Sequence, residues 1–502
     1  MKKKQIPLLV FIFIFAFCLR ILFLQKLSLT FGYDQARDAI ISQQILAGDW
    51  KILGPPASIP GLYHGVFYYY LLAPAYFFGH GSPLSAAYWI ALLNAAAVFI
   101  VFYLGYRMTN KIWVGILASF LFALSFEATQ YATWLSNPTI GVWTVPLMYL
   151  GLWLWINSEN KFAPVITALG LGFSIQSEIF LIYHAIPLVL WLWLSRKNVN
   201  KKQIIIFMIT LLMTLGSMFL SEIKFGFRSI GGLISLAGGS EANLAYAKSI
   251  GDYLILYLNQ IGRIFSFNSF PGNIGWGGGF VIVLALYSLI KRDKIGTFLA
   301  TWLFSHITVV KVGGVTTPFL MVGIGPAVSL IIAYYLAKWW QLKYFLIVIG
   351  ILIIIISGNL IFIFRENPKG STLFAIQKDM LLSKQLSLID FSYQEAKGKE
   401  FSINSLTSPL WINIVWTYLY KWYGLPKYKY LPSWHGRDQV GQLDSLPKDT
   451  DKINNYFLIL EPMGGIPSQY LDQTLDEENV VSKIISEKNY GELRIQKRER
   501  VK

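Results

Sequence analysis

Two aspartates and an arginine stand close together near the start of the chain. Asp34, Arg37 and Asp38 follow an apolar segment that ends near residue 24. Asp34 and Asp38 are four residues apart, so on a helix they share a face with Arg37 beside them. A carboxylate in this position can act as a general base or as a metal ligand. The other interpretation is structural: Asp34 caps the helix N-terminus and Asp38 is solvated.

A second group of polar residues lies in a loop rich in glycine and proline. Pro60 and Gly61 precede Tyr63 and His64, and an aromatic stretch follows up to residue 70. Such a loop is rigid and delivers the histidine to the start of an aromatic segment. His64 would then contact a phosphate or a sugar, and Tyr63 would stack on a sugar face. Alternatively, the tyrosines form an interfacial aromatic belt that needs no ligand.

Three further charged residues are candidates for substrate binding. Glu178 lies between two apolar segments, and a carboxylate at such a place is a functional candidate by default. Arg263 and Lys311 are cations that would stabilise charge developing on a phosphate. The structural alternatives are a polar pair with a neighbouring helix for Glu178, and ordinary lipid phosphates as partners of the cations.

Several kinds of site are missing from the sequence. No Walker loop, dinucleotide fingerprint or His-Glu-x-x-His motif is present. Cys18, the only cysteine, cannot form an internal disulfide. No cluster has the spacing of a dedicated metal site, and we expect no cofactor, although Asp34 with Asp38 could recruit a divalent ion weakly.

Composition identifies the elements that must position these residues. Of 502 residues, 55% are hydrophobic and only 14% are charged, against roughly a quarter in soluble domains. Residues 1–364 hold 24 basic and 10 acidic residues, whereas 365–502 hold 19 and 17. We therefore predict a polytopic α-helical membrane protein, with a transmembrane body at 1–364 and a polar tail at 365–502. Because most bases lie beside spans, nucleic-acid binding is a poor explanation of the net charge of +16.

Apolar runs of roughly 20 residues predict about eleven transmembrane helices. The expected spans are 6–24, 84–106, 112–130, 138–157, 163–178, 179–195, 203–223, 275–290, 296–310, 317–337 and 342–364. Basic residues recur in alternate loops, which places the N-terminus in the cytoplasm. The tail then lies outside as a small extracytoplasmic α/β domain. We expect its strands at 456–460, 480–485 and 493–495, and long outer loops at about 25–83 and 224–274.

Four features in this order resemble the GT-C superfamily of membrane glycosyltransferases, in the branch of protein O-mannosyltransferases and lipid A aminoarabinose transferases. They are a Tyr-Asp stretch after the first span, a proline-rich element leading into an aromatic helix, an Asn-Pro at the fourth span, and a lysine before a proline-containing span. The resemblance covers about residues 1–340. The matching positions are Tyr33 to Ala39, Pro60 to Gly79, Asn137-Pro138, and Lys311 with Pro318 and Pro326.

This resemblance implies a cell-membrane enzyme that transfers a hexose or pentose from a polyprenyl-phosphate donor at the outer membrane face. The acceptor would be a hydroxyl of a protein, lipid or glycan. Asp34 matches the general base of the family, and the sugar is usually transferred with inversion. The chain has Gln35 where many members have glutamate, and His64-Gly65-Val66-Phe67 where many have Lys-Pro-Pro-Leu.

Other functions would use the same outer carboxylates differently. A transporter or flippase for a lipid-linked sugar would bind with them rather than react, although the chain shows no internal repeat. An O-antigen-ligase-like enzyme would need arginine and histidine in its late outer loop, and 224–274 has Arg228 and Arg263 but no histidine. A non-catalytic assembly protein is the third alternative.

Overall fold

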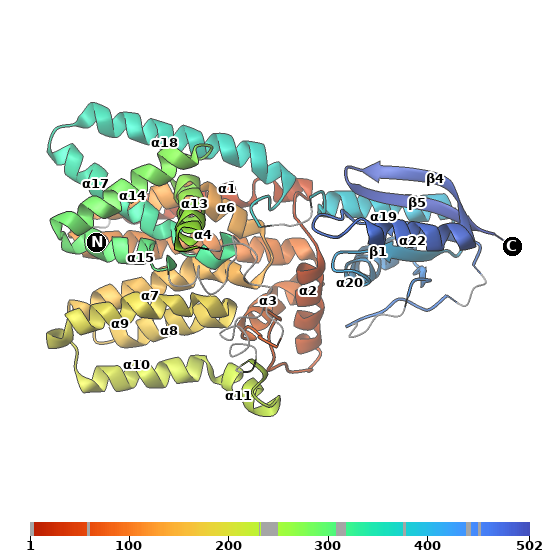
Figure 1. Cartoon of the computed structure of the whole chain (residues 1–502), viewed down its shortest axis with the longest axis horizontal. Helices are drawn as coiled ribbons and strands as arrows, with labels where there is room; N and C mark the ends of the chain where they lie inside the picture. Colours follow the sequence, from red (N-terminus) through yellow and green to blue (C-terminus); the bar gives the residue numbers. More distant parts are fainter. Residues whose placement is uncertain are drawn as a thin grey trace.

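The computed structural model describes residues 5–57, 61–229, 231, 249–307, 318–374, 378–437, 443–449 and 453–501. The chain forms a bundle of helices that lie along the long axis of the molecule, with a smaller domain at one end (Figure 1). The bundle contains α1 (Ile6–Ile21), α4 (Pro83–Thr109), α5 (Ile112–Leu124), α6 (Phe126–Thr133), α7 (Gly141–Ile156), α8 (Ala163–Ser177), α9 (Ala185–Leu194), α10 (Lys201–Thr214), α11 (Gly216–Lys224), α14 (Ile274–Lys291), α15 (Lys294–Leu303), α17 (Gly325–Gln341) and α18 (Phe345–Glu366).

Each predicted span coincides with helical structure where its residues are described. Fewer than eleven of these helices, however, are long and apolar enough on their own to cross a membrane. Within the described residues, five helical segments are long and apolar enough to cross a membrane. Two bent pairs, α5 with α6 and α10 with α11, raise that number to seven. The pairs bend by 57° and 54° at their breaks. The predicted spans at 163–178 and 179–195 are shorter apolar helices that meet at the expected break, so a total of eleven stays a prediction.

The first outer loop, 25–83, contains two helices at the end of the bundle that faces the smaller domain (Figure 1). They are α2 (Tyr33–Leu46) and α3 (Phe67–Phe78), and they pack against each other. Their apolar residues belong to a core shared with the smaller domain, which includes Phe31 and Tyr68. The predicted loop is therefore an ordered layer between the bundle and the tail.

The second predicted outer loop, 224–274, is wrong over its second half. Residues Ile250–Asn268 form α13, whose buried side chains include Ile261 and Phe265. Figure 1 shows α13 nearly end-on, across the direction of its neighbours. It packs against α14, α17 and α6. The capping box at Ser249 and the apolar spacing of this segment explain why it is helical.

The tail forms a five-stranded mixed sheet with helices. Strand order is β2-β1-β3-β5-β4, where β1 is parallel to β2 and β3, and β5 is antiparallel to β3 and β4. The predicted strand at 480–485 begins later, because Val480 and Val481 end a helix. The elements are α19 (Leu382–Ala396), β1 (Ser402–Leu406), α20 (Ile414–Leu419), α21 (Leu425–Tyr428), β2 (Ser433–Trp434), β3 (Asn455–Leu460), α22 (Gln469–Val481), β4 (Ser482–Tyr490) and β5 (Leu493–Arg500).

Backbone hydrogen bonds join this C-terminal domain to the segment that leads into α2. The amide of Phe31 donates to Met380 at 2.9 Å, and the amide of Leu382 donates to Leu29 at 2.8 Å. The Gln385 side chain also donates to the carbonyl of Phe31 at 2.7 Å. The start of α2 is thus fixed by residues more than 300 positions away in the sequence.

We predict that the C-terminal domain lies outside the cell. The N-terminus and this domain are at opposite ends of the bundle, as an odd number of crossings requires (Figure 1). In a Cys18→Ser background, Glu400→Cys in the exposed turn after α19 should react with a membrane-impermeant maleimide in intact cells. Lys291→Cys, at the exposed end of α14, is the control and should react only after lysis. The reverse pattern would contradict the orientation.

Candidate active site

A cavity of about 360 Å³ opens at the N-terminal end of α2. Asp34 and Arg37 line it from α2, and Pro56 and Ala57 line it from the following loop. Trp134 lines it from the segment after α6, and the tail contributes Phe374, Met380, Ser408 and Pro409. The Trp134 and Phe374 rings are stacked, with centroids 4.7 Å apart, and form an aromatic wall. The cavity therefore combines one polar corner with a flat apolar surface.

The glutamine beside Asp34 holds the start of α2 in place. Gln35 accepts a hydrogen bond from the amide of Gly32 at 2.9 Å, which closes the cap of the helix. Its amide group also donates to the carbonyl of Leu135 at 3.0 Å. A glutamate cannot donate this second bond at neutral pH. Gln35, in place of the glutamate found in many proteins of the family that the sequence resembles, thus ties α2 to the segment after α6.

Arg37 contacts both aspartates, which differ strongly in exposure. One guanidinium nitrogen is 2.7 Å from Oδ1 of Asp34, and Nε donates to Oδ1 of Asp38 at 2.8 Å. The side chains of Arg37 and Asp38 are 6% and 1% exposed, whereas that of Asp34 is 49% exposed. Asp38 is therefore not the solvated residue of the structural interpretation, and the helix cap is Gly32 rather than Asp34. Among the described residues that line the cavity, only Asp34 carries a carboxylate.

Burial and charge act in opposite directions on Asp38. Its removal from water raises its pKa to about 7, although the charge of Arg37 opposes this shift. Oδ2 of Asp38 is buried and has no hydrogen-bond partner among the described residues. The two carboxylates raise the pKa of Arg37 despite its burial, so the guanidinium stays charged. The buried carboxylate of Asp38 fixes the guanidinium of Arg37, and Arg37 in turn orients Asp34.

His64 and Glu178 form a separate buried cluster behind the cavity. Nδ1 of His64 accepts a hydrogen bond from the amide of Ile179 at 3.2 Å and lies 3.7 Å from Glu178. Burial, with the charge of Arg37 adding to it, lowers the pKa of His64 to about 3. Burial keeps the imidazole neutral, and its contact with a phosphate or a sugar stays a prediction. Glu178 accepts a bond from the amide of Phe180 and caps the segment before α9.

Tyr63 shapes the loop instead of lining the cavity. It pairs with Pro56 in an isolated antiparallel bridge, and the amide of His64 donates to Pro55 at 2.9 Å. The amide of Gly65 also donates to the carbonyl of Gln176 at 2.8 Å, which fastens the loop to the end of α8. These bonds place Pro56 and Ala57 at the cavity wall.

The two remaining cation candidates are not brought to the cavity by the described structure. Arg263 lies on α13, with its guanidinium 6.0 Å from the centroid of the Phe267 ring, and it does not line the cavity. Lys311 lies outside the described residues. Among the residues that the structure describes, no group of three or more His, Cys, Asp or Glu side chains could hold a metal ion.

Sequence reasoning missed the aromatic wall and the contribution of the tail. Trp134 closely follows a predicted span, and a tryptophan at that position could have been recognised as a stacking surface. Phe374, Ser408 and Pro409 lie in the tail, and no local pattern connects them to Asp34.

The fold can be compared with solved structures. ArnT from Cupriavidus metallidurans bound to undecaprenyl phosphate superposes with a TM-score of 0.59, over 99% of this chain and 98% of that one, at 10% identity. Its apo state gives 0.58 over 98% of both chains, also at 10% identity. The chain has the GT-C fold. An oligosaccharyltransferase from Archaeoglobus fulgidus gives 0.50 at 16% identity, over 81% of this chain and 61% of that one. No family model and no curated protein matches the sequence.

We predict that Arg37 is a main stabilising residue of this chain. Arg37→Met leaves the buried Asp38 without its cation, which typically costs about 3–5 kcal/mol. Thermal unfolding of the purified protein should occur at a clearly lower temperature. Arg365→Met is the control, because it breaks an ion pair whose arginine is 54% exposed and should change stability by less than about 1 kcal/mol. Equal effects of the two variants would contradict the prediction.

The neutral state of His64 predicts how stability depends on pH. In the unfolded chain His64 takes up a proton below about pH 6.5, whereas the folded chain stays neutral down to about pH 3. Stability is therefore lost as the pH falls, by about 2 kcal/mol between pH 7.5 and 5. The raised pKa of Asp38 acts in the opposite sense, so the difference between wild type and His64→Gln isolates this contribution. A pH-independent difference in unfolding would show that His64 titrates normally.

Proposed function

We propose that this chain is a glycosyltransferase that moves a sugar from a polyprenyl-phosphate donor to an acceptor hydroxyl at the outer membrane face. The observation that supports this most directly is the half-exposed carboxylate of Asp34 in a cavity at the end of a GT-C bundle. One of the similar structures contains undecaprenyl phosphate. The acceptor would be a protein, lipid or glycan, and we propose no metal and no nucleic acid.

The geometry supports Asp34 as general base. Its carboxylate would accept the proton of the acceptor hydroxyl, whose oxygen attacks the anomeric carbon of the sugar. The bond from that carbon to the phosphate oxygen breaks, and polyprenyl phosphate leaves with the bonding electrons. Attack from the opposite side inverts the anomeric centre. Arg37 orients Asp34, because it stays charged and binds only one of the two carboxylate oxygens in the described contacts.

The aromatic wall suits the sugar of the donor. A pyranose ring has a face of C–H groups, and such a face packs well on a flat aromatic side chain. Trp134 and Phe374 line the same cavity as Asp34. Their rings stack on each other at 4.7 Å, and Phe374 also stacks on Tyr131 at 4.2 Å, so the sugar would contact the part of the Trp134 ring that faces the cavity. We propose that Lys311 stabilises the leaving phosphate, while Tyr63, His64 and Glu178 shape the loop beside the cavity.

We predict that Asp34→Asn abolishes transfer. A positioned general base contributes typically 100- to 10,000-fold to the rate, and asparagine keeps the size of the side chain. Cells that lack the protein should be complemented with wild type or variants, and their envelope glycans analysed by mass spectrometry. Asp49→Asn, at an aspartate that is 62% exposed and outside the cavity, is the control and should restore the glycans.

Assays with purified wild type and Asp34→Asn separate the alternatives. Purified Asp34→Asn protein should retain donor binding but fail to transfer sugar. A flippase would translocate the lipid-linked sugar, and purified wild-type protein would transfer none. An O-antigen-ligase-like enzyme or an assembly protein would tolerate Asp34→Asn. Near-full transfer by this variant would overturn the proposed mechanism.

Lys311 provides a test of the leaving-group charge. The phosphate gains charge as the sugar departs, so a fixed cation helps the transition state more than the ground state. Lys311→Ala should lower turnover strongly, and Lys311→Arg should restore part of it. If Lys311 meets only bulk lipid head groups, neither turnover nor donor affinity will change.

A further inference from the structure

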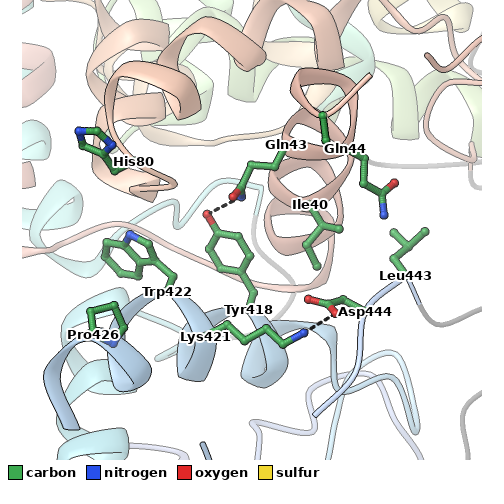
Figure 2. A pocket seen from close by; sticks show the side chains of 11 residues that line it. Ile40, Gln43, Gln44, His80, Tyr418, Lys421, Trp422, Pro426, Leu443 and Asp444 are labelled. Atoms are coloured by element: carbon green, nitrogen blue, oxygen red, sulfur yellow. Dashed lines mark hydrogen bonds and ion pairs between the residues drawn. The ribbon is translucent and has the colours of Figure 1, made fainter. Parts of the chain in front are cut away.

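A second, larger cavity lies between the C-terminal half of α2 and the C-terminal domain. It has a volume of about 570 Å³. Figure 2 shows Gln43 pointing from α2 to the hydroxyl of Tyr418 and Gln44 extending toward Leu443, while Trp422 and the Lys421–Asp444 ion pair line the side formed by the C-terminal domain. None of these residues takes part in the site at Asp34.

The lining of this cavity is polar but electrically balanced. Gln43 donates to the hydroxyl of Tyr418 at 3.4 Å, and that hydroxyl donates to the carbonyl of Gly81. Lys421 and Asp444 neutralise each other in a direct ion pair. Oε1 of Gln44 is buried and has no hydrogen-bond partner among the described residues. An unpaired acceptor of this kind is costly unless a ligand or water satisfies it.

We propose that this cavity binds a neutral saccharide. Sugar rings combine an apolar C–H face with a rim of hydroxyl groups. The partly exposed ring of Trp422 can pack on the face, while amide and carboxylate groups of Gln44 and Asp444 can bond neighbouring hydroxyls. A side-chain amide both donates and accepts, which suits hydroxyl groups because they do the same.

Other ligand classes fit this lining less well. An anionic ligand would need a cation, but Lys421 already contacts Asp444. An extended peptide would gain most from pairing with an exposed strand edge, and the described residues that line the cavity belong to helices and loops. A purely apolar ligand would leave Oε1 of Gln44 without a hydrogen bond.

The position of the cavity identifies the saccharide as part of the acceptor, and this step rests on the proposed transferase function. Asp34 and Gln43 are nine residues apart on one helix, which corresponds to about 14 Å along its axis. Both cavities are walled by α2 and by the C-terminal domain. Nine residues are two and a half helical turns, so an acceptor glycan that holds its distal sugars at Trp422 and its terminal hydroxyl at Asp34 must span this distance and pass from one face of α2 to the other.

The direct test is binding of the purified full-length chain, in lipid nanodiscs, to an array of neutral oligosaccharides, acidic oligosaccharides and unglycosylated peptides. We expect binding to neutral oligosaccharides. Trp422→Ala should weaken it about tenfold, equivalent to about 1.4 kcal/mol. Trp276→Ala is the matched control, because Trp276 is 76% exposed and lies outside the cavity. Gln44→Ala provides a second variant if Trp422→Ala folds poorly.

Asp34→Asn separates this inference from the proposed function. It should bind the array like wild type while losing transfer. Three outcomes would overturn the saccharide site and leave the base at Asp34 standing. They are failure of neutral oligosaccharides to bind, binding of peptides or acidic glycans alone, and binding by Trp422→Ala and Gln44→Ala that is as tight as that of wild type. Retained transfer by Asp34→Asn, together with binding that depends on Trp422, would overturn the transferase mechanism alone.

Discussion

The contact of Arg37 with two unequal aspartates is the constraint on which the rest of the site depends. A buried guanidinium needs a counter-charge, and Asp38 provides one that water does not reach. The same guanidinium extends to Asp34, whose carboxylate is half exposed. One cation thus anchors a buried carboxylate and orients an exposed one. This division explains how a helix with two aspartates four residues apart offers only one of them to a substrate.

The C-terminal domain is part of the site rather than an appendage. Its residues hold the strand-like segment before α2 through the bonds of Phe31 and Leu29, and they contribute Ser408 and Pro409 to the cavity. Gln35 fastens the same helix to the transmembrane bundle through Leu135. Helix α2 is therefore held from two sides. Because Asp34 is already fixed in place, less conformational entropy is lost when a substrate binds.

The sequence could predict the parts of this arrangement that depend on local pattern. Apolar runs predicted where the helices lie, and the four-residue spacing correctly placed Asp34 and Asp38 on one helix. The strand at 456–460 was also found, because its run of aromatic and aliphatic residues matches β3. The order of weak motifs predicted the fold that the comparison with ArnT confirms.

The errors concern burial and contacts between distant segments. The exposure of Asp38 depends on neighbours from other elements, and no spacing rule reveals it. The helix at Ile250–Asn268 was taken for loop because its apolar residues are interrupted by polar ones, as an amphipathic helix requires. The short helices α8 and α9 show why apolar length alone does not fix the number of crossings.

The central claim is that the donor's head group lies between Asp34 and the aromatic wall of Trp134 and Phe374. The most direct measurement is a cryo-electron microscopy structure of the Asp34→Asn protein in nanodiscs with a bound polyprenyl-phosphate sugar. The account predicts density for the sugar in this cavity, with its anomeric carbon facing residue 34. A head group bound elsewhere, with this cavity closed to it by the C-terminal domain, would contradict the account.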